Sequence, residues 1–342
     1  MKEKTKIGII GLGLIGGSIA LALSGDYAIL GYDTDGATRE YAKSHGICEI
    51  VEPKEMRAAA LIFVCVPVFC MAEALENARA AVGDKVVIAD VASVKMPYAG
   101  LISGYVGTHP MAGTERGGIA SAKKHLFENA YWVITDKGER ADFVRAVIEK
   151  TGAKPLYMSA EEHDRTVAKY SHVPHAIAYA LVTTATDGAQ PIAGSGFMDT
   201  TRIAASDERF WTEVFLNNGD NVSRGLGEVV AELNKIDGMI KSGDRDGLMK
   251  YLGAARVRRS ALNRVDLGGE VLYVDLVDRI GEFERVTGAV ARAGINLTNI
   301  ALVPGREGAS GALRLEFGSA DDKTTAARVL GIDLKNDDAE DK

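Results

Sequence analysis

The sequence predicts an α/β protein with a doubly wound sheet, followed by an all-α segment and a small α+β unit at the carboxyl end. Three observations predict this order. Short apolar runs alternate with helical patterns through about residue 160, helical periodicity dominates residues 161–265, and strand-like runs return from residue 268. Alternating strands and helices are typical of parallel pairing. We therefore expect domains at 1–160, 161–265 and 268–334, and a disordered acidic tail at 335–342.

The composition is that of an ordinary globular protein, with 46% hydrophobic and 25% charged residues among 342. The net charge of -7 and an isoelectric point near 5.5 argue against nucleic acid or an anionic membrane as a partner. Apolar runs are too short to span a membrane, and no signal-peptide pattern is visible. The cysteines Cys48, Cys65 and Cys70 lack metal-ligand spacing. We expect a cytoplasmic protein without a metal site, its cysteines being buried, reduced thiols.

The first segment alternates strands and helices in order. Strands are expected at residues 6–10, 27–32, 61–66, 85–91, 105–108 and 130–134, and helical runs at 19–23 and 72–81. In an open parallel sheet, ligands bind outside the carboxyl ends of the strands. Residues that directly follow a strand are therefore the first candidates for a functional site.

Seven residues form a dinucleotide-binding fingerprint, six in a glycine-rich turn after the first strand and one acid at the end of the second. They are Gly11, Leu12, Gly13, Leu14, Ile15, Gly16 and Asp33. Glycine permits the tight turn and the approach of a pyrophosphate, and the following helix amino terminus attracts its phosphates. The Asp33 carboxylate suits ribose hydroxyls and repels a 2′-phosphate. The sequence thus predicts a Rossmann-like domain that binds NAD rather than NADP.

Ser93 and His109 are the predicted catalytic residues. Ser93 follows the strand at 85–91, although capping a helix is an alternative role. Lys95, two residues further on, is either a site residue or a solvated charge. His109 lies in a Gly/Pro-rich loop, where it either satisfies backbone groups or acts chemically. Because imidazole titrates in the range needed to take a hydroxyl proton during hydride transfer, the sequence predicts a dehydrogenase with His109 as its base.

Three residues are candidates for binding substrate. Arg202, in an otherwise small and uncharged stretch, suits a substrate carboxylate, with an internal ion pair as the alternative. Glu115, flanked by glycines, either gates a pocket or faces solvent. His172 and His175 begin or interrupt a helix, and a third metal ligand at the right spacing is lacking. We expect His172 to hydrogen-bond substrate or loop, and His175 to pack within the helix.

Five segments resemble prephenate dehydrogenases across about residues 5–265. They are GLGLIGGS at 11–18, DVASVK at 90–95, GTHPMAGTERGG at 107–118, SHVPHAIAYAL at 171–181 and TTRIAASDERFW at 200–211. The first is shared by many dehydrogenases, whereas the histidine segment and the two that follow it are specific. The resemblance implies oxidative decarboxylation of prephenate by NAD to 4-hydroxyphenylpyruvate, CO₂ and NADH, in tyrosine biosynthesis. It also implies a homodimer formed through the helical domain.

The resemblance assigns roles to the predicted site residues. His109 would hydrogen-bond the ring 4-hydroxyl and assist its deprotonation, and Ser93 would help position that hydroxyl. Arg202 would hold a substrate carboxylate. Glu115 matches a position that gates the pocket in this family, and His172 matches one near the bound substrate.

The unit at 268–334 resembles an ACT domain, a small ferredoxin-like βαββαβ regulatory module that often binds amino acids. Residues 271–281 and 293–297 carry this likeness, although Ile280 stands where the family pattern has proline. We hypothesise that tyrosine, the end product implied by the resemblance, is a feedback effector that binds there or at the active site.

Three alternative functions stay open at this point. Arogenate dehydrogenase performs the same chemistry on the transaminated substrate. A 3-hydroxyacid dehydrogenase also joins a Rossmann domain to helices but relies on a lysine in its helical domain, for which we see no convincing motif. A catalytically inactive sensor of NAD and amino acids would have no use for Ser93, His109 and Arg202 together.

Overall fold

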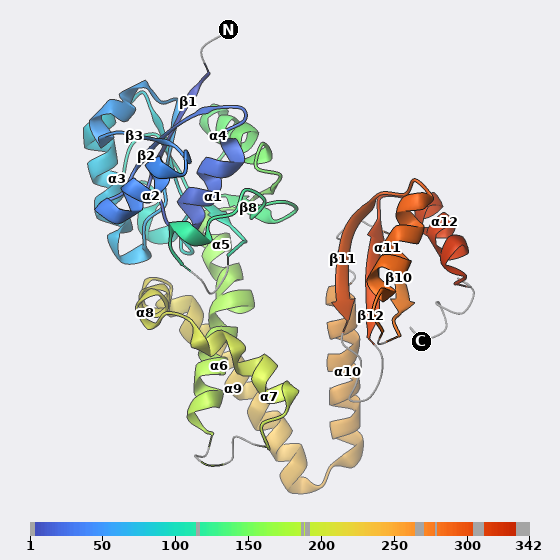
Figure 1. Ribbon diagram of the computed structural model, residues 1–342. Helices are drawn as coiled ribbons and strands as arrows, with labels where there is room; N and C mark the ends of the chain where they lie inside the picture. Colours follow the sequence, from blue (N-terminus) through green and yellow to red (C-terminus); the bar gives the residue numbers. More distant parts are fainter. Residues whose placement is uncertain are drawn as a thin grey trace. The chain divides into compact units, whose positions relative to one another are not determined.

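The computed structural model describes residues 4–113, 117–185, 188, 192–263, 270–277, 279–303 and 311–332. It contains two compact units, Met1–Lys235 and Ile236–Lys342 (Figure 1). In the part of the chain that is described, no helix combines the length and the apolar character needed to cross a membrane.

A six-stranded parallel sheet forms the centre of the first unit. Its strands are β1 (Lys6–Ile10), β2 (Ala28–Tyr32), β3 (Glu49–Ile50), β4 (Leu61–Val64), β5 (Val87–Asp90) and β6 (Tyr105–Val106). They lie in the order β3-β2-β1-β4-β5-β6, with parallel pairing throughout. The predicted doubly wound sheet is confirmed. Its strand order reverses between β1 and β4, which is where such sheets bind their ligands.

Helices cover both faces of this sheet. Successive side chains of a strand point to opposite faces, so Phe63 of β4 joins one core cluster and Ile62 joins the other. The first cluster is completed by α1 (Leu14–Leu23), α2 (Gly36–Ser44) and α4 (Glu139–Glu149). The second is completed by α3 (Val68–Val82) and by α8 (Glu208–Asn217), which packs against α3. A helix from the second half of the chain thereby closes the nucleotide domain's core.

The predicted strand at 105–108 is divided between two sheets. After β6 the chain passes Gly107 and enters β7 (Thr108–Pro110), which pairs antiparallel with β8 (Tyr131–Ile134). Strand β8 pairs in parallel with β9 (Lys154–Tyr157). A Cβ on Gly107 would lie 2.3 Å from Thr135 Oγ1, so only glycine fits this crossing. The prediction that His109 lies in a loop is therefore wrong. Pairing with β8 makes this short segment a strand.

Within residues 161–265, where periodicity predicts helix, two helical stretches are interrupted. The first is α5 (Ala160–Val167), a π-helical turn (Ala168–His172) and α6 (Val173–Thr183). Pro174 has no N–H to donate to the helical ladder, which explains the break where His172 and His175 were expected to begin or interrupt a helix. The second divides at Asn218 into α8 and α9 (Gly219–Ser242). The chain between α6 and α8 contains α7 (Ser195–Thr201) and a 3₁₀ helix (Arg202–Ala205).

The cysteines only partly match expectation. All three are free thiols, but Cys70 is exposed on α3, so its predicted burial is wrong. Cys48 and Cys65 are half-buried, and burial raises the pKa of the Cys48 thiol to about 11. Cys70 lies in the first turn of α3, outside the buried stripe of this helix, which includes Met71 and Leu75. The local sequence did not indicate which face of the helix is buried.

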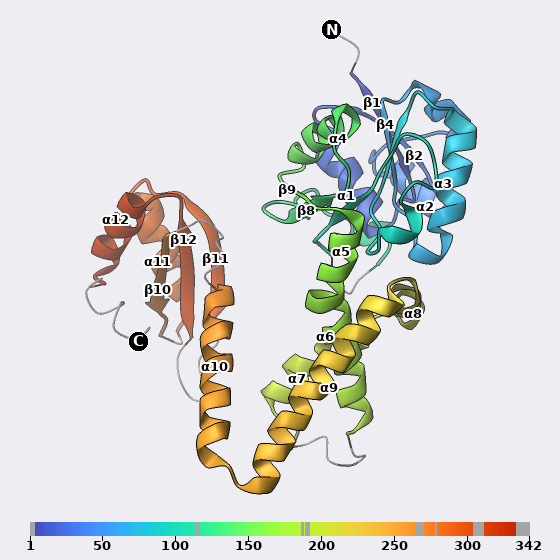
Figure 2. The same cartoon turned by 180° about the vertical axis from the view of Figure 1, so that it is seen from behind.

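The second unit contains α10 (Arg245–Asn263) and an α+β fold. The latter follows the order β10 (Glu270–Asp275), α11 (Glu282–Arg292), β11 (Leu297–Val303), β12 (Ala312–Phe317) and α12 (Ala320–Leu330). Its antiparallel sheet has the order β10-β12-β11, and Figure 2 shows it from behind. Buried side chains of the sheet, α11 and α12 form one core. The small α+β unit predicted for this segment is observed, whereas the tail at 335–342 lies outside the described residues.

The fold makes a testable prediction about α3. Leu75 is fully buried in the second core cluster, so Leu75→Ala removes apolar contacts and leaves a cavity. We expect a loss of about 2–5 kcal/mol in the free energy of unfolding, measured by urea denaturation and circular dichroism. Leu216→Ala on α8, where the leucine is 72% exposed, is the matched control and should change stability by less than about 0.5 kcal/mol. Equal losses in both variants would contradict this packing.

Candidate active site

The glycine-rich turn and Asp33 meet at the end of β1. The Leu12 N–H donates to Asp33 Oδ2 at 2.7 Å. Gly11 has φ +92°, and a Cβ there would lie 2.5 Å from the Cys65 carbonyl oxygen. A Cβ on Gly16 would lie 1.9 Å from the Gly11 carbonyl oxygen. Steric contact therefore requires glycine at both positions, as the fingerprint predicted.

The same turn fits the pyrophosphate of a dinucleotide. A Cβ built on Gly13 meets nothing within 4 Å, so this side of the turn is open to a ligand. Gly13 is also the N-cap of α1, where no side chain caps the helix and no acid lies in the first turn. The first N–H groups of α1 and its positive dipole end are therefore available to phosphate oxygens.

Asp90, at the end of β5, is a fully buried carboxylate that gathers the surrounding loops. Its Oδ1 accepts from the Thr108 N–H at 2.9 Å and from the Tyr105 hydroxyl at 3.0 Å. Its Oδ2 accepts from the Ala92 N–H at 3.0 Å and from Lys95 Nζ. These contacts join β5, the loop after it, β6 and β7 around one carboxyl group.

Lys95 is buried rather than a solvated charge. Its side chain is 1% exposed, and its ammonium donates to Asp90 Oδ2 and, at 2.5 Å, to the Thr108 carbonyl oxygen. Burial lowers the pKa of Lys95, and the Asp90 carboxylate opposes this effect. Ser93 lies half-buried on the bend between Asp90 and Lys95, at the carboxyl edge of the sheet as predicted.

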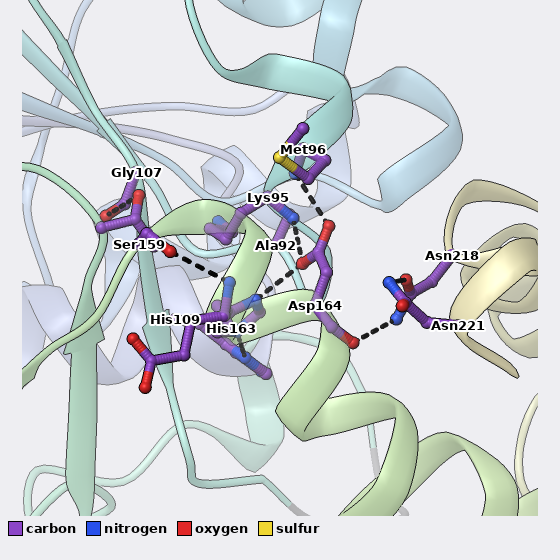
Figure 3. A network of polar contacts seen from close by, with 12 residues as sticks. Ala92, Lys95, Met96, Gly107, His109, Ser159, His163, Asp164, Asn218 and Asn221 are labelled. Atoms are coloured by element: carbon purple, nitrogen blue, oxygen red, sulfur yellow. Dashed lines mark hydrogen bonds and ion pairs between the residues drawn. The ribbon is translucent and has the colours of Figure 1, made fainter. Parts of the chain in front are cut away.

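His109 begins a chain of polar contacts between β7 and α5 (Figure 3). Its Nδ1 lies 2.9 Å from His163 Nε2, and His163 Nδ1 lies 2.7 Å from Asp164 Oδ1. Asp164 also accepts the N–H groups of Lys95 and Met96, each at 2.8 Å. His163 and Asp164 were not predicted from the sequence. Their one local signal is an adjacent His-Asp pair in the helix that Ser159 caps.

Burial and neighbouring positive charge both act on His109. Burial is the largest cause that holds the pKa of His109 well below its usual 6.5, and His163, Lys95 and His172 add to it. The neutral imidazole is therefore the stable form. A neutral imidazole with one nitrogen engaged by His163 has the other available to accept a proton.

His172 is joined to the same network through Asn218. The side chain of His172 is buried, and its Nδ1 lies 3.2 Å from Asn218 Nδ2. Asn218 Nδ2 donates at 2.7 Å to the Asp164 carbonyl oxygen. Burial lowers the pKa of His172 to about 4, so this ring is also neutral. Asn218, a third residue not predicted from the sequence, owes its place to the break between α8 and α9.

Arg202 and His175 form a second group. His175 stacks on Trp211 with ring centroids 3.5 Å apart and planes 23° apart. Burial, and to a smaller extent the charge of Arg202, lower the pKa of His175. Arg202 itself is exposed on the 3₁₀ helix. The histidine expected only to pack in a helix is thus within electrostatic reach of the arginine expected to bind a carboxylate.

Glu115 lies outside the described residues, so its expected gating role has no geometry here. Across the described ranges, no group of three or more His, Cys, Asp or Glu side chains is arranged to hold a metal ion.

Comparison with known proteins follows the division seen in the sequence. The family model for the prephenate dehydrogenase nucleotide-binding domain matches residues 19–157, and the model for the dimerization domain of the same family matches residues 159–254. Prephenate dehydrogenase of Bacillus subtilis is 32% identical over 96% of this chain and 96% of its own length. This match extends through the carboxyl-terminal unit.

Two solved structures resemble about three quarters of the chain. Prephenate dehydrogenase from Aquifex aeolicus, in complex with hydroxyphenyl propionate and NAD+, has a TM-score of 0.70 and 28% identity, and covers 76% of this chain and 99% of its own. Synechocystis arogenate dehydrogenase has a TM-score of 0.69 and 30% identity, and covers 75% of this chain and 100% of its own. With both family models matched in order and a curated relative aligned almost end to end, the chain belongs to the prephenate dehydrogenase family.

Proposed function

We propose that this protein catalyses the NAD-dependent oxidative decarboxylation of prephenate to 4-hydroxyphenylpyruvate, CO₂ and NADH. The observation that carries the proposal is the neutral His109 imidazole, held by His163 at one nitrogen within a domain that has an open dinucleotide turn. The family supports the substrate. The hydroxyphenyl propionate and NAD+ named for the Aquifex aeolicus structure support the same ligand classes.

The glycine-rich turn and Asp33 are the residues that would hold NAD. The N–H groups at the start of α1 would bind the pyrophosphate, and Asp33 would accept from the adenosine ribose. Leu12, Leu14 and Ile15 form the rest of that turn and its entry into the helix. The chemistry that bound NAD supplies is acceptance of a hydride.

His109 would act on the 4-hydroxyl group of the prephenate ring. Its unprotonated nitrogen takes the hydroxyl proton as the C4–H bond breaks and the hydride leaves. The bond from the ring to its carboxylate then breaks, CO₂ departs, and the electron pair completes the aromatic ring. The oxygen regains a proton from the imidazolium, because the product is a phenol. His109 thus ends the cycle neutral, as it began.

The other predicted residues would place the substrate around this histidine. Ser93, at the carboxyl edge of the sheet, would hold the 4-hydroxyl, and Arg202 would bind a substrate carboxylate with its planar guanidinium. His172 would lie near the substrate through the network that it shares with His109. Glu115 is proposed as the gate of the pocket.

Arogenate is the second candidate substrate. The Synechocystis arogenate dehydrogenase structure, at 30% identity, supports it to a similar degree, because the two substrates differ only in a keto or amino group on the side chain. Both would undergo the same ring chemistry at His109, so the substrate decides the name of the activity and not its mechanism.

Assembly and regulation complete the proposal. A homodimer is supported by the match to the dimerization domain and by exposed apolar side chains on one stripe of α9, namely Val230, Leu233 and Ile240. The βαββ order of the second unit, followed by α12, supports an ACT-like module. Tyrosine is proposed as its effector, although the exposed Ile280 replaces the proline of the usual pattern.

The activity is tested by following NADH formation with prephenate and with arogenate supplied separately. We expect His109→Asn to lower kcat by about 10²–10⁴-fold, the usual contribution of a positioned base, with NAD binding unchanged. His125→Asn, at an exposed histidine paired with Glu128, is the control and should retain activity. Turnover of arogenate alone would change the substrate. Absence of turnover of either substrate by the wild-type protein would contradict the enzyme proposal.

The lowered pKa of His109 predicts a pH profile. His163 on α5, Lys95 after β5 and His172 on the π-helical turn face this ring and disfavour its charged form. Since the base is active when neutral, kcat/KM for prephenate should stay level as the pH falls through 6.5 and decline only at more acidic pH. Initial rates across buffers measure this. An acid limb centred at or above 6.5 would contradict the lowered pKa of His109.

The dimer is tested by sedimentation equilibrium. Leu233→Asp places a charge in the apolar stripe of α9 and should shift the protein toward monomer by at least about tenfold in Kd. Asn234→Asp adds the same charge at the next position, on a different side of the helix, and should leave the dimer intact. Equal effects of the two substitutions would exclude this stripe as the interface.

A further inference from the structure

We propose that His163 and Asp164 are positioning residues that hold the proton of His109 on Nδ1 and thereby keep its Nε2 unprotonated and ready to act as the base. The assignment of the proton rests on the contacts of these three residues alone. Its consequence for catalysis rests on the proposed function.

Asp164 determines which groups donate in the hydrogen bonds that link it to His163 and His109, because its carboxylate contacts donors only. Oδ1 accepts from the Lys95 N–H at 2.8 Å and lies 2.7 Å from His163 Nδ1, and Oδ2 accepts from the Met96 N–H at 2.8 Å. A main-chain N–H group can only donate a hydrogen bond. Both oxygens are thus committed as acceptors, and a proton on either would face another donor.

The tautomer of His163 in turn determines which nitrogen of His109 carries the proton. Because Asp164 Oδ1 only accepts, His163 Nδ1 carries the proton between them, and in the neutral ring Nε2 is the acceptor. His109 Nδ1, 2.9 Å from that Nε2, must therefore be the donor. The neutral His109 then has its lone pair on Nε2.

The opposite arrangement has two forms, and both are unfavourable here. A neutral His163 protonated at Nε2 would direct the lone pair of Nδ1 at the Asp164 carboxylate. A doubly protonated His163 would be a cation in a fully buried place near the Lys95 ammonium, and burial lowers the pKa of His163. The ring pair, 5.1 Å apart and 73° between planes, also fixes the orientation of His109 edge-on to His163.

The pair is held firmly enough to perform this role. The main-chain N–H of His163 donates at 2.8 Å to the Ser159 carbonyl oxygen at the start of α5. The Asp164 carbonyl oxygen accepts from the Asn218 side chain. The same Asp164 carboxylate fixes the main chain at Lys95 and Met96, just after the bend that carries Ser93. One carboxylate thus sets both the proton of the base and the loop beside it.

The tautomer is tested directly by ¹⁵N NMR of the histidine rings in the full-length protein. The His109 signals are identified by their absence in His109→Gln. We expect a neutral His109 with a protonated Nδ1 and an unprotonated Nε2. Asp164→Asn, whose amide can donate to His163 Nδ1 and reverse the chain, should shift His109 toward a protonated Nε2. A wild-type His109 protonated at Nε2 would overturn the proposal.

Kinetics test the positioning role with a pair of substitutions at His163. His163→Phe removes the acceptor for His109 Nδ1 and should lower kcat by about 10²-fold or more, with KM for prephenate changed less than about threefold, because His163 lies behind the base. His163→Asn keeps an amide oxygen that can accept the same proton and should recover part of kcat. His125→Phe is the control on an exposed histidine.

The outcomes separate this proposal from the proposed function. A folded His163→Phe protein that binds NAD and keeps kcat within about twofold of wild type would overturn the positioning role. A wild-type protein without turnover would overturn the proposed function instead, and the NMR tautomer would then decide the proton assignment alone.

Discussion

The buried carboxylate of Asp90 is the constraint on which the site depends. It ends strand β5 and accepts from the Ala92 and Thr108 N–H groups, the Tyr105 hydroxyl and the Lys95 ammonium. A buried charge is tolerated only when it is paired and hydrogen-bonded, and removing one partner of such a pair typically costs about 3–5 kcal/mol. The main chain therefore has little freedom wherever Asp90 binds it, and His109 follows directly after one of those points.

A second carboxylate, that of Asp164, joins the helices to the nucleotide-binding sheet. It belongs to α5, yet it accepts the N–H groups of Lys95 and Met96 in the loop after β5. The loop after β5 is thus bound by two buried carboxylates, Asp90 from the sheet and Asp164 from the helical segment. Ser93 lies on the bend between Asp90 and Lys95. The position of this serine is a consequence of satisfying buried main-chain donors.

The histidines show how environment divides one residue type among several tasks. His109 and His172 are both kept neutral by burial, but His109 has His163 at one nitrogen whereas His172 contacts Asn218. His175 stacks on Trp211 near the charge of Arg202. In the proposed mechanism, the neutral His109 would act as the base, the contact with His163 would orient it, and Arg202 would supply positive charge for an anionic substrate. These are the separate requirements of removing a proton and a hydride from a carboxylate-bearing alcohol.

The sequence by itself determined the doubly wound sheet and the glycine-rich turn with Asp33. Each depends on residues close together in the chain, through periodicity or backbone freedom. Only the tertiary structure decided that His109 lies on a strand, that Lys95 is buried, and that His163 and Asp164 stand behind His109. The contacts of Asp164 with Lys95 and of His163 with His109 join residues more than fifty positions apart, and the strand that contains His109 pairs with one 24 positions further on. They arise because buried polar groups must find partners, and local sequence does not specify which distant segment supplies them.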